Sequence, residues 1–160
     1  KTLPQHPIAA ELATFEWALG LAFDAEDVST LTLQDLAAVP PEEWSGVMLK
    51  AHPSVQLLAF KSNVILVWQA LNTEQKPPKA KKCLEPCVVW RKGLDSHYRS
   101  LENLEMLALK QVINGLTFAA LCEFLQGGKV VETFTEEAAM QKAATYLSGW
   151  LNDGLLIKTI

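Results

Sequence analysis

The first hydrophobic pattern along the chain predicts a helix at residues 7–22. Apolar side chains recur there at the spacing of one helix face, at Ile8, Leu12, Phe15 and Leu19. Pro7 suits the first turn, where its missing N–H would have no partner anyway. At about 100° per residue, Trp17 and Leu21 point to the opposite side. A helix that is apolar on two sides usually lies between two layers, so we expect this helix to be covered on both.

Shorter elements follow up to residue 71. The pattern predicts a short helix at about 33–38, a stop at the Pro40–Pro41 pair and a short helical turn after it. Residues 47–60 read as a strand, a break and a second strand. The apolar run at 63–71 fits either a short helix or a continuation of the preceding run, because periodicity does not separate the two over so short a length.

Residues 72–86 lack a hydrophobic period and hold three prolines and four lysines. That composition is typical of a linker. We place the linker at residues 76–86, between an N-terminal part, residues 1–75, and a C-terminal part, residues 87–160.

The C-terminal part begins with two predicted strands, 87–92 and 96–101, whose connection at 93–95 is short enough for a hairpin. The first of three helices then ends at Asn114–Gly115, a frequent helix-end pair. Its apolar stripe consists of Leu101, Leu104, Ala108 and Val112.

The second helix covers residues 117–125, with Thr117 as its cap. Residues 126–134 predict a loop or a hairpin, and Thr133 or Thr135 caps the third helix. The expected stripe of that helix consists of Met140, Ala143, Ala144, Leu147 and Leu151. The last residues, 153–160, predict a final strand.

These elements predict an α+β protein. The N-terminal part is mainly helical with short strands, and the C-terminal part has the order β-β-α-α-α-β of a winged-helix-like unit. The 160 residues suffice for one domain or two small ones, and 49% apolar residues suffice for a core.

The net charge of −4 gives no general attraction to phosphate backbones. The sequence contains neither a membrane span nor a signal peptide, and its three cysteines are too sparse for a disulfide scaffold, so we expect a cytoplasmic protein. Because it begins with Lys1, we expect it to be part of a longer chain.

Two of the cysteines, Cys83 and Cys87, are separated by three residues. A structural zinc site usually needs four ligands, and the sequence offers no second pair beside them. Cys122 falls inside a predicted amphipathic helix, and His6, His52 and His97 are scattered. We therefore expect no metal and no cofactor, and a disulfide or redox pair is the weaker alternative.

DNA binding is a further function that the sequence allows to be tested. The basic cluster at 76–82 fits a solvated linker or a contact with nucleic acid or an acidic partner. A recognition helix places cationic or amide side chains in the major groove. The helix at 117–125 has no cation, and the helix at 136–151 has only Lys142 and starts with two acids. Both disfavour DNA binding by these residues.

Catalytic motifs are not visible. The sequence contains no G-x-S-x-G, H-E-x-x-H or P-loop pattern. Glu102 and Glu105 share a helix face, as solvated acid pairs often do, and a single strand histidine such as His97 is more often structural than a base. We therefore expect the chain not to be an enzyme.

Four stretches together resemble the HvfC-type bacterial family. They are LATFEWALGLAFDAED, AHPSVQLLAF followed by VILVWQA, PCVVWRKG, and LENLEMLALKQVINGLTFAAL. The residues that match the family pattern are Glu16, Trp17, His52, Pro53, Ser54, Trp68, Arg91, Glu105, Gly115 and Thr117. The resemblance covers nearly the whole chain. The sequence departs from the family at HPIAAEL, where the family has a Tyr-Leu-x-Asp-Leu start.

The resemblance implies an accessory role in bacterial peptide maturation. Its partners would be a multinuclear-iron TIM-barrel enzyme and a small cysteine-containing precursor peptide, and the chain itself would do no chemistry. The family's N-terminal module, which often carries a DNA-binding label, would precede Lys1. The alternative is therefore a DNA-binding transcriptional regulator that uses that module.

The last 75 residues also resemble the PqqD-like peptide-recognition fold, in which a leader peptide adds to a strand edge and lies against the third helix. The resemblance places the edge at His97, Tyr98 and Arg99, and the helix face at Tyr146 and Trp150. β-Augmentation of this kind draws its affinity from main-chain hydrogen bonds. The two aromatic residues lie off the expected stripe and would line a groove, and the alternative is that both belong to the core.

Overall fold

The computed structural model describes residues 7–127 and 133–159, which form a mixed α+β fold. The N-terminal elements are α1 (Pro7–Phe23), α2 (Leu33–Ala37), the 3₁₀ helix η1 (Pro41–Gly46), β1 (Met48–Leu49), β2 (Gln56–Ser62) and α3 (Val64–Asn72). The C-terminal elements are β3 (Lys82–Lys92), β4 (Asp95–Ser100), α4 (Asn103–Ile113), β5 (Leu116–Thr117), α5 (Phe118–Gln126) and α6 (Glu136–Asp153).

The main sheet is antiparallel, with the strand order β2-β3-β4. The predicted hairpin is confirmed as β3 and β4, with Gly93 at φ 64° in its turn. Residues 82–86, expected in the linker, instead begin β3 and pair with β2. Their composition alone does not predict a strand, because the strand depends on pairing with residues 56–62, which are distant in sequence. The division into parts 1–75 and 87–160 stays a prediction, and both parts supply strands to this sheet.

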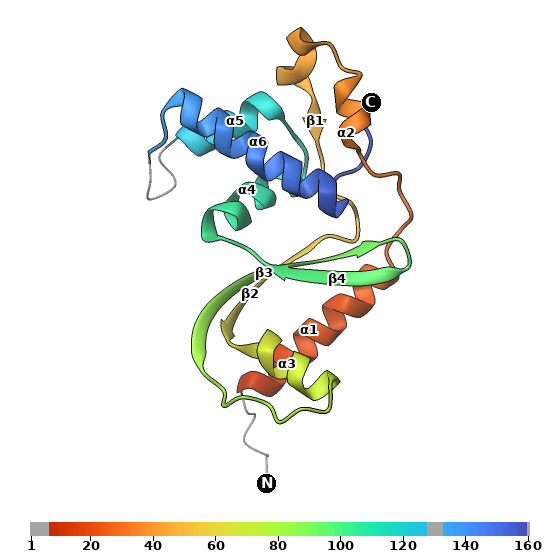
Figure 1. The fold of residues 1–160 in the computed structure, drawn as a ribbon, viewed down its shortest axis with the longest axis vertical. Coiled ribbons are helices and arrows are strands. Elements are labelled where there is room, and N and C mark those ends of the chain that lie inside the picture. Colours follow the sequence, from red (N-terminus) through yellow and green to blue (C-terminus); the bar gives the residue numbers. More distant parts are fainter. Residues whose placement is uncertain (1–6, 128–132, 160) are drawn as a thin grey trace.

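The sheet separates two hydrophobic clusters. Along β3, Cys87 and Val89 face one cluster and Val88 and Trp90 face the other, because successive side chains of a strand point to opposite faces. Figure 1 shows α1 and α3 on one side of the sheet and α4, α5 and α6 on the other. Each strand residue in the middle of β3 is therefore buried whichever way it points.

The predicted first helix is confirmed as α1, but only one of its sides is covered. Phe15 is fully buried beside Phe60, whereas Trp17 is 70% exposed and Leu21 is 44% exposed. The expectation that both sides are covered is therefore wrong for the described residues, because α1 lies outside the sheet as an outer layer. The ambiguous run at 63–71 is a helix, α3, and the Ile65 N–H at its first turn donates to the Glu85 side chain.

The other predicted helix starts are also confirmed. Thr117 caps α5, and Thr135, rather than Thr133, caps α6, each by accepting from a backbone N–H three residues later at 3.2 Å. The prediction for residues 126–134 falls mostly outside the described residues. The expected final strand is reduced to two isolated bridges, Ala51 with Leu156 and Thr30 with Ile157, because the chain end meets two separate segments.

Candidate functional site

The outer edge of β4 is the first candidate site. Leu101 N–H donates to the Pro86 carbonyl at 2.8 Å, in continuation of the β3–β4 register. Bonded and non-bonded pairs alternate along an antiparallel ladder, so Ser96, Tyr98 and Ser100 turn their backbone groups away from β3. Among the described residues, the backbone groups of these three form no hydrogen bond to a backbone group outside the sheet, although the Arg99 side chain reaches the Ser100 carbonyl at 3.4 Å and the Ser96 hydroxyl donates to the Leu19 carbonyl of α1 at 2.8 Å. The outer edge of β4 is therefore open to a further strand.

Two of the expected site residues flank this edge on opposite faces. His97 is exposed, and its ring stacks on Trp90 with centroids 5.6 Å apart. Tyr98 is half-buried and meets Phe15 and Trp68 edge to face, at 5.1 and 5.6 Å. The Tyr98 hydroxyl accepts from Gln69 at 2.9 Å. An added strand would thus have an imidazole on one side and an aromatic cluster on the other.

Arg99, the third expected residue of this edge, is held by two carboxylates. Its guanidinium donates to Glu105 at 2.7 and 3.1 Å, and its Nε donates to Asp153 at 2.8 Å. These bonds, first of all those that Arg99 donates to Glu105, raise the pKa of Arg99 against the opposing effect of burial. A bidentate pair of this kind fixes geometry as well as charge. Arg99 therefore joins β4 to α4 and α6.

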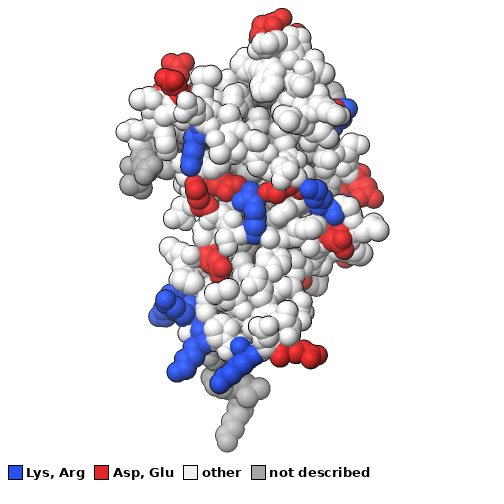
Figure 2. Space-filling model, in the orientation of Figure 1, with Lys and Arg blue, Asp and Glu red and all other residues white. Residues whose placement is uncertain are grey.

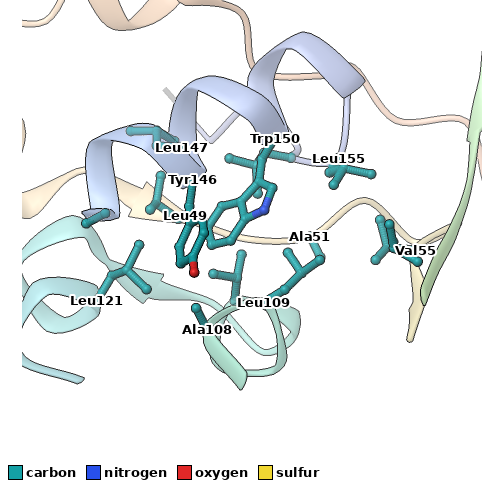
Figure 3. Packing of buried hydrophobic residues seen from close by; sticks show 14 of the residues in the cluster. Leu49, Ala51, Val55, Ala108, Leu109, Leu121, Tyr146, Leu147, Trp150 and Leu155 are labelled. Carbon is teal, nitrogen blue, oxygen red and sulfur yellow. The ribbon is translucent and has the colours of Figure 1, made fainter. Parts of the chain in front are cut away.

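Tyr146 and Trp150 lie in the core, which is the alternative that the sequence left open, so neither residue lines the expected groove. Trp150 is fully buried, Tyr146 is 6% exposed, and their rings stack with centroids 5.8 Å apart. Figure 3 shows both rings reaching from α6 toward Ala108 and Leu109 of α4. The buried face of α6 consists of Ala139, Ala143, Tyr146, Leu147 and Trp150.

The error in the expected stripe arose from the choice of helix face. The expected stripe shared only Ala143 and Leu147 with the buried face, and Met140 is 51% exposed. The polar atoms of the two aromatic side chains bond to carboxylates: Trp150 Nε1 donates to the buried Glu105 at 3.0 Å, and the Tyr146 hydroxyl donates to the exposed Glu102 at 3.2 Å. Both residues therefore support β4 and α4 from within.

A second polar cluster lies where β2 begins. His52 Nδ1 accepts from the Ser54 N–H at 3.1 Å and lies 2.8 Å from the Ser54 hydroxyl, which in turn accepts from the Arg91 N–H at 3.0 Å. Because Nδ1 accepts, the ring proton lies on Nε2, toward the Val28 carbonyl. Burial lowers the pKa of His52, which is therefore neutral. Sequence reasoning took His52 as scattered, but the structure unites it with two matched residues of the family pattern, Ser54 and Arg91.

This cluster has the atoms of a nucleophile and a base, but their setting is structural. Ser54 is 1% exposed and His52 is 5% exposed. The cavity of about 440 Å³ beside them is also lined by Arg91 and Lys92. Arg91 bonds to Asp27 and to the Phe23 carbonyl, and Lys92 bonds to the Asn152 carbonyl at 2.8 Å. The Ser54–Arg91 bond therefore extends the β2–β3 contact beyond the first residue of β2, and both cations are bonded to other groups of the fold.

The three cysteines differ in their exposure to solvent. Cys83 is exposed, Cys122 is half-buried, and all three thiols are free. Burial, followed by the charge of Glu85, raises the pKa of Cys87 to about 12. Within residues 7–127 and 133–159, no three His, Cys, Asp or Glu side chains are grouped so as to hold a metal ion.

One feature that sequence reasoning missed is an apolar cavity of about 790 Å³ between η1, α5 and the start of α6, named here the α5 cavity. Trp44, Phe118 and Met140 are among the residues that line it. Their separation along the chain hid the cavity from any local pattern. The only local signal was a tryptophan directly after the Pro-Pro-Glu-Glu run.

None of the described helices is long and apolar enough to cross a membrane. A comparison with known families found no family model that matches this chain, and a comparison with curated proteins found no matching sequence.

Proposed function

We propose that this chain is a non-catalytic accessory protein that binds a precursor peptide in bacterial peptide maturation. The observation that carries the proposal is the open outer edge of β4, where Ser96, Tyr98 and Ser100 present backbone groups. An extended peptide that adds there gains main-chain hydrogen bonds, while neighbouring side chains supply selectivity. The resemblance to the HvfC-type family adds the second partner, a multinuclear-iron TIM-barrel enzyme. We also propose a cytoplasmic location, on the basis of the sparse cysteines of the sequence.

The expected site residues divide into two roles under this proposal. His97 and Tyr98 flank the edge and contact the peptide. Arg99, Tyr146 and Trp150 are positioning residues, because their polar atoms are bonded to Glu102, Glu105 and Asp153. We also propose that residues 87–160 form the winged-helix-like, PqqD-like unit, and the hairpin followed by α4, α5 and α6 supports this assignment.

The alternative, a DNA-binding regulator, finds less support in these residues. Lys142, the one cation of α6, pairs with Glu102 at 3.3 Å and lies 5.0 Å from the centroid of the Tyr146 ring. Two glutamates open the same helix. A cation held in this way is poorly placed to bind a phosphate or a base edge.

The test is co-expression of the complete chain with the products of its neighbouring genes, with a DNA mobility-shift assay beside it. We expect a stable complex with an iron enzyme or its precursor peptide, and no DNA shift. A salt-sensitive shift without a protein partner would instead support the regulator.

Ser100 offers a matched pair of variants for the edge itself. Ser100→Pro removes an outward N–H and adds a ring at the edge, which an edge strand tolerates. Ser100→Ala keeps the N–H. We expect Ser100→Pro to weaken peptide binding about fivefold or more, since one net hydrogen bond contributes about 1 kcal/mol. Ser100→Ala should bind like the parent, and equal binding by both variants would reject β4 as the peptide site.

A further inference from the structure

The α5 cavity has an apolar floor and an acidic border. Val39 lines it from the loop after α2, Trp44 from η1, Phe118 and Cys122 from α5, and Met140 from α6. Trp44 is fixed there by the bond from its indole N–H to the Val39 carbonyl, at 3.1 Å. Burial, and to a lesser extent the charge of Glu123, raise the pKa of the Cys122 thiol. The thiol therefore stays neutral and adds to the apolar lining.

The border of the cavity carries negative charge. Glu123 and Glu136 line it, and no lysine or arginine is among its described lining residues. Neither carboxylate forms an ion pair within the part of the chain that the structure describes. Figure 2 shows the lysines and arginines of one face mainly across the middle and at the lower end of the molecule. A ligand with apolar groups and a cation would match both the floor and the border.

The dimensions of the cavity favour a helix as that ligand. Its lining on α5 runs from Phe118 to Gln126, which corresponds to about 12 Å along the helix axis, or about two turns. An amphipathic helix places apolar anchors at i, i+4 and i+7 over the same length. Its flanking lysines or arginines would then face Glu123 and Glu136.

We propose that the α5 cavity is a second interaction surface, which binds a basic amphipathic helix of a partner polypeptide. This surface is separate from the outer edge of β4, because its lining residues belong to η1, α5, the start of α6 and the loop around Val39. Figure 1 shows α5 at the end of the molecule opposite to α1 and α3. The proposal therefore holds whether or not a peptide binds at β4.

The test measures fluorescence anisotropy of a labelled, alanine-based helical peptide of about fourteen residues with the full chain. The peptide carries leucines at i, i+4 and i+7 and lysines on both flanks of that stripe, and a second peptide replaces every lysine by glutamate. We expect the lysine peptide to bind at least about tenfold more tightly, with a preference that decreases as salt increases. Equal affinities, or no binding of the lysine peptide, would overturn the proposal.

Variants locate the binding. The double variant Glu123→Gln/Glu136→Gln should bind the lysine peptide about fivefold more weakly, because each rim charge contributes a fraction of a kcal/mol. Glu137→Gln is its control: Glu137 is the next residue of α6, is also exposed, and is not among the residues that line the cavity. A loss of affinity in Glu137→Gln as large as in the double variant would show general attraction to the helix start and overturn the proposal.

The apolar part of the contact has its own pair of variants. Met140→Gln keeps the length of the side chain, and we expect it to weaken binding about fivefold. Leu71→Gln, at a similarly exposed leucine of α3, should leave binding unchanged. Thermal melts show whether each variant is folded. If Ser100→Pro abolishes binding of the lysine peptide and Met140→Gln does not, the peptide binds at β4 and the α5 cavity is rejected.

Discussion

Trp150 Nε1 and Arg99 Nη2 both donate to one oxygen of Glu105, at 3.0 and 2.7 Å. Glu105 is 8% exposed, so this carboxylate is a buried junction of α4, α6 and β4. A buried charge is stable only when its partners are complete. The junction therefore keeps the proposed peptide edge at a defined distance from the helical layer.

Removal of the Glu105 carboxylate should destabilise the fold markedly. Glu105→Ala leaves the Arg99 guanidinium and the Trp150 indole without their acceptor, and we expect it to lower the free energy of unfolding by about 2–3 kcal/mol. Glu102→Ala is the control, because Glu102 is 65% exposed and its loss should cost below about 1 kcal/mol. Urea denaturation of both variants measures the difference, and similar costs would contradict the role of Glu105 as a junction.

His52 should make stability depend on pH. Its pKa in the folded state lies below the ordinary value of about 6.5, so the unfolded chain binds a proton that folded His52 does not as the pH falls below that value. The free energy of unfolding should therefore decrease between about pH 7 and pH 5, by at most about 1.4 kcal/mol per pH unit.

The variant His52→Asn separates this effect from other titrations. Asparagine also accepts from the backbone N–H two residues later, so it retains the turn at Ser54 while removing the titrating ring. We expect lower stability at pH 7 but a flatter pH profile, measured by chemical denaturation at several pH values. Parallel profiles of parent and variant would show that another group titrates.

Replacement of Glu85 by a neutral residue should stabilise the fold. Burial raises its pKa above the ordinary value of 4.5, and its Oε2 atom is buried without a hydrogen-bond partner. The charged form is thus disfavoured in the folded state, and stability is lost as the pH rises through the folded-state pKa. Glu85→Gln removes the charge and retains an acceptor for the Ile65 N–H.

We expect Glu85→Gln to raise the melting temperature at pH 7, with a gain below about 1 kcal/mol. The gain should decrease as the pH falls and disappear at about pH 3, where Glu85 is protonated in both states. Glu85→Ala is the control, because it removes the acceptor as well and should not stabilise. A larger gain at pH 4 than at pH 7 would contradict the explanation.

Two glycines of the α6 region should respond in opposite directions to the same change. A Cβ at Gly149, inside the helix, would meet no atom within 4 Å, so Gly149→Ala should stabilise by about 0.5–1 kcal/mol. Gly154 ends the helix at φ 75°, in the left-handed region, so Gly154→Ala should destabilise by about 1 kcal/mol. Differential scanning calorimetry compares the two, and equal shifts would exclude a backbone origin.

Local signals along the sequence were enough for the helix starts and the hairpin. Thr117 and Thr135 each accept a hydrogen bond from a backbone N–H three residues later, so their capping roles can be predicted without knowledge of the tertiary structure. The strand character of residues 82–86 is not predictable from their composition, because it depends on pairing with residues 56–62. The sequence leaves Tyr146 and Trp150 open between a groove and the core, because α4 and α5, not the helix itself, decide which face of α6 is buried.

The main sheet also has a consequence for how the chain unfolds. Val88 and Val89 are neighbours on β3 and are both fully buried, one in each hydrophobic cluster. If the helices on one side of the sheet separate from it, the β3 side chains that face that side become exposed to water. Opening of either cluster therefore destabilises the strand that both clusters share. Amide hydrogens of β3 should consequently exchange with solvent only in the global unfolding event, and excision of either terminal part should leave an aggregating remnant rather than a smaller folded protein.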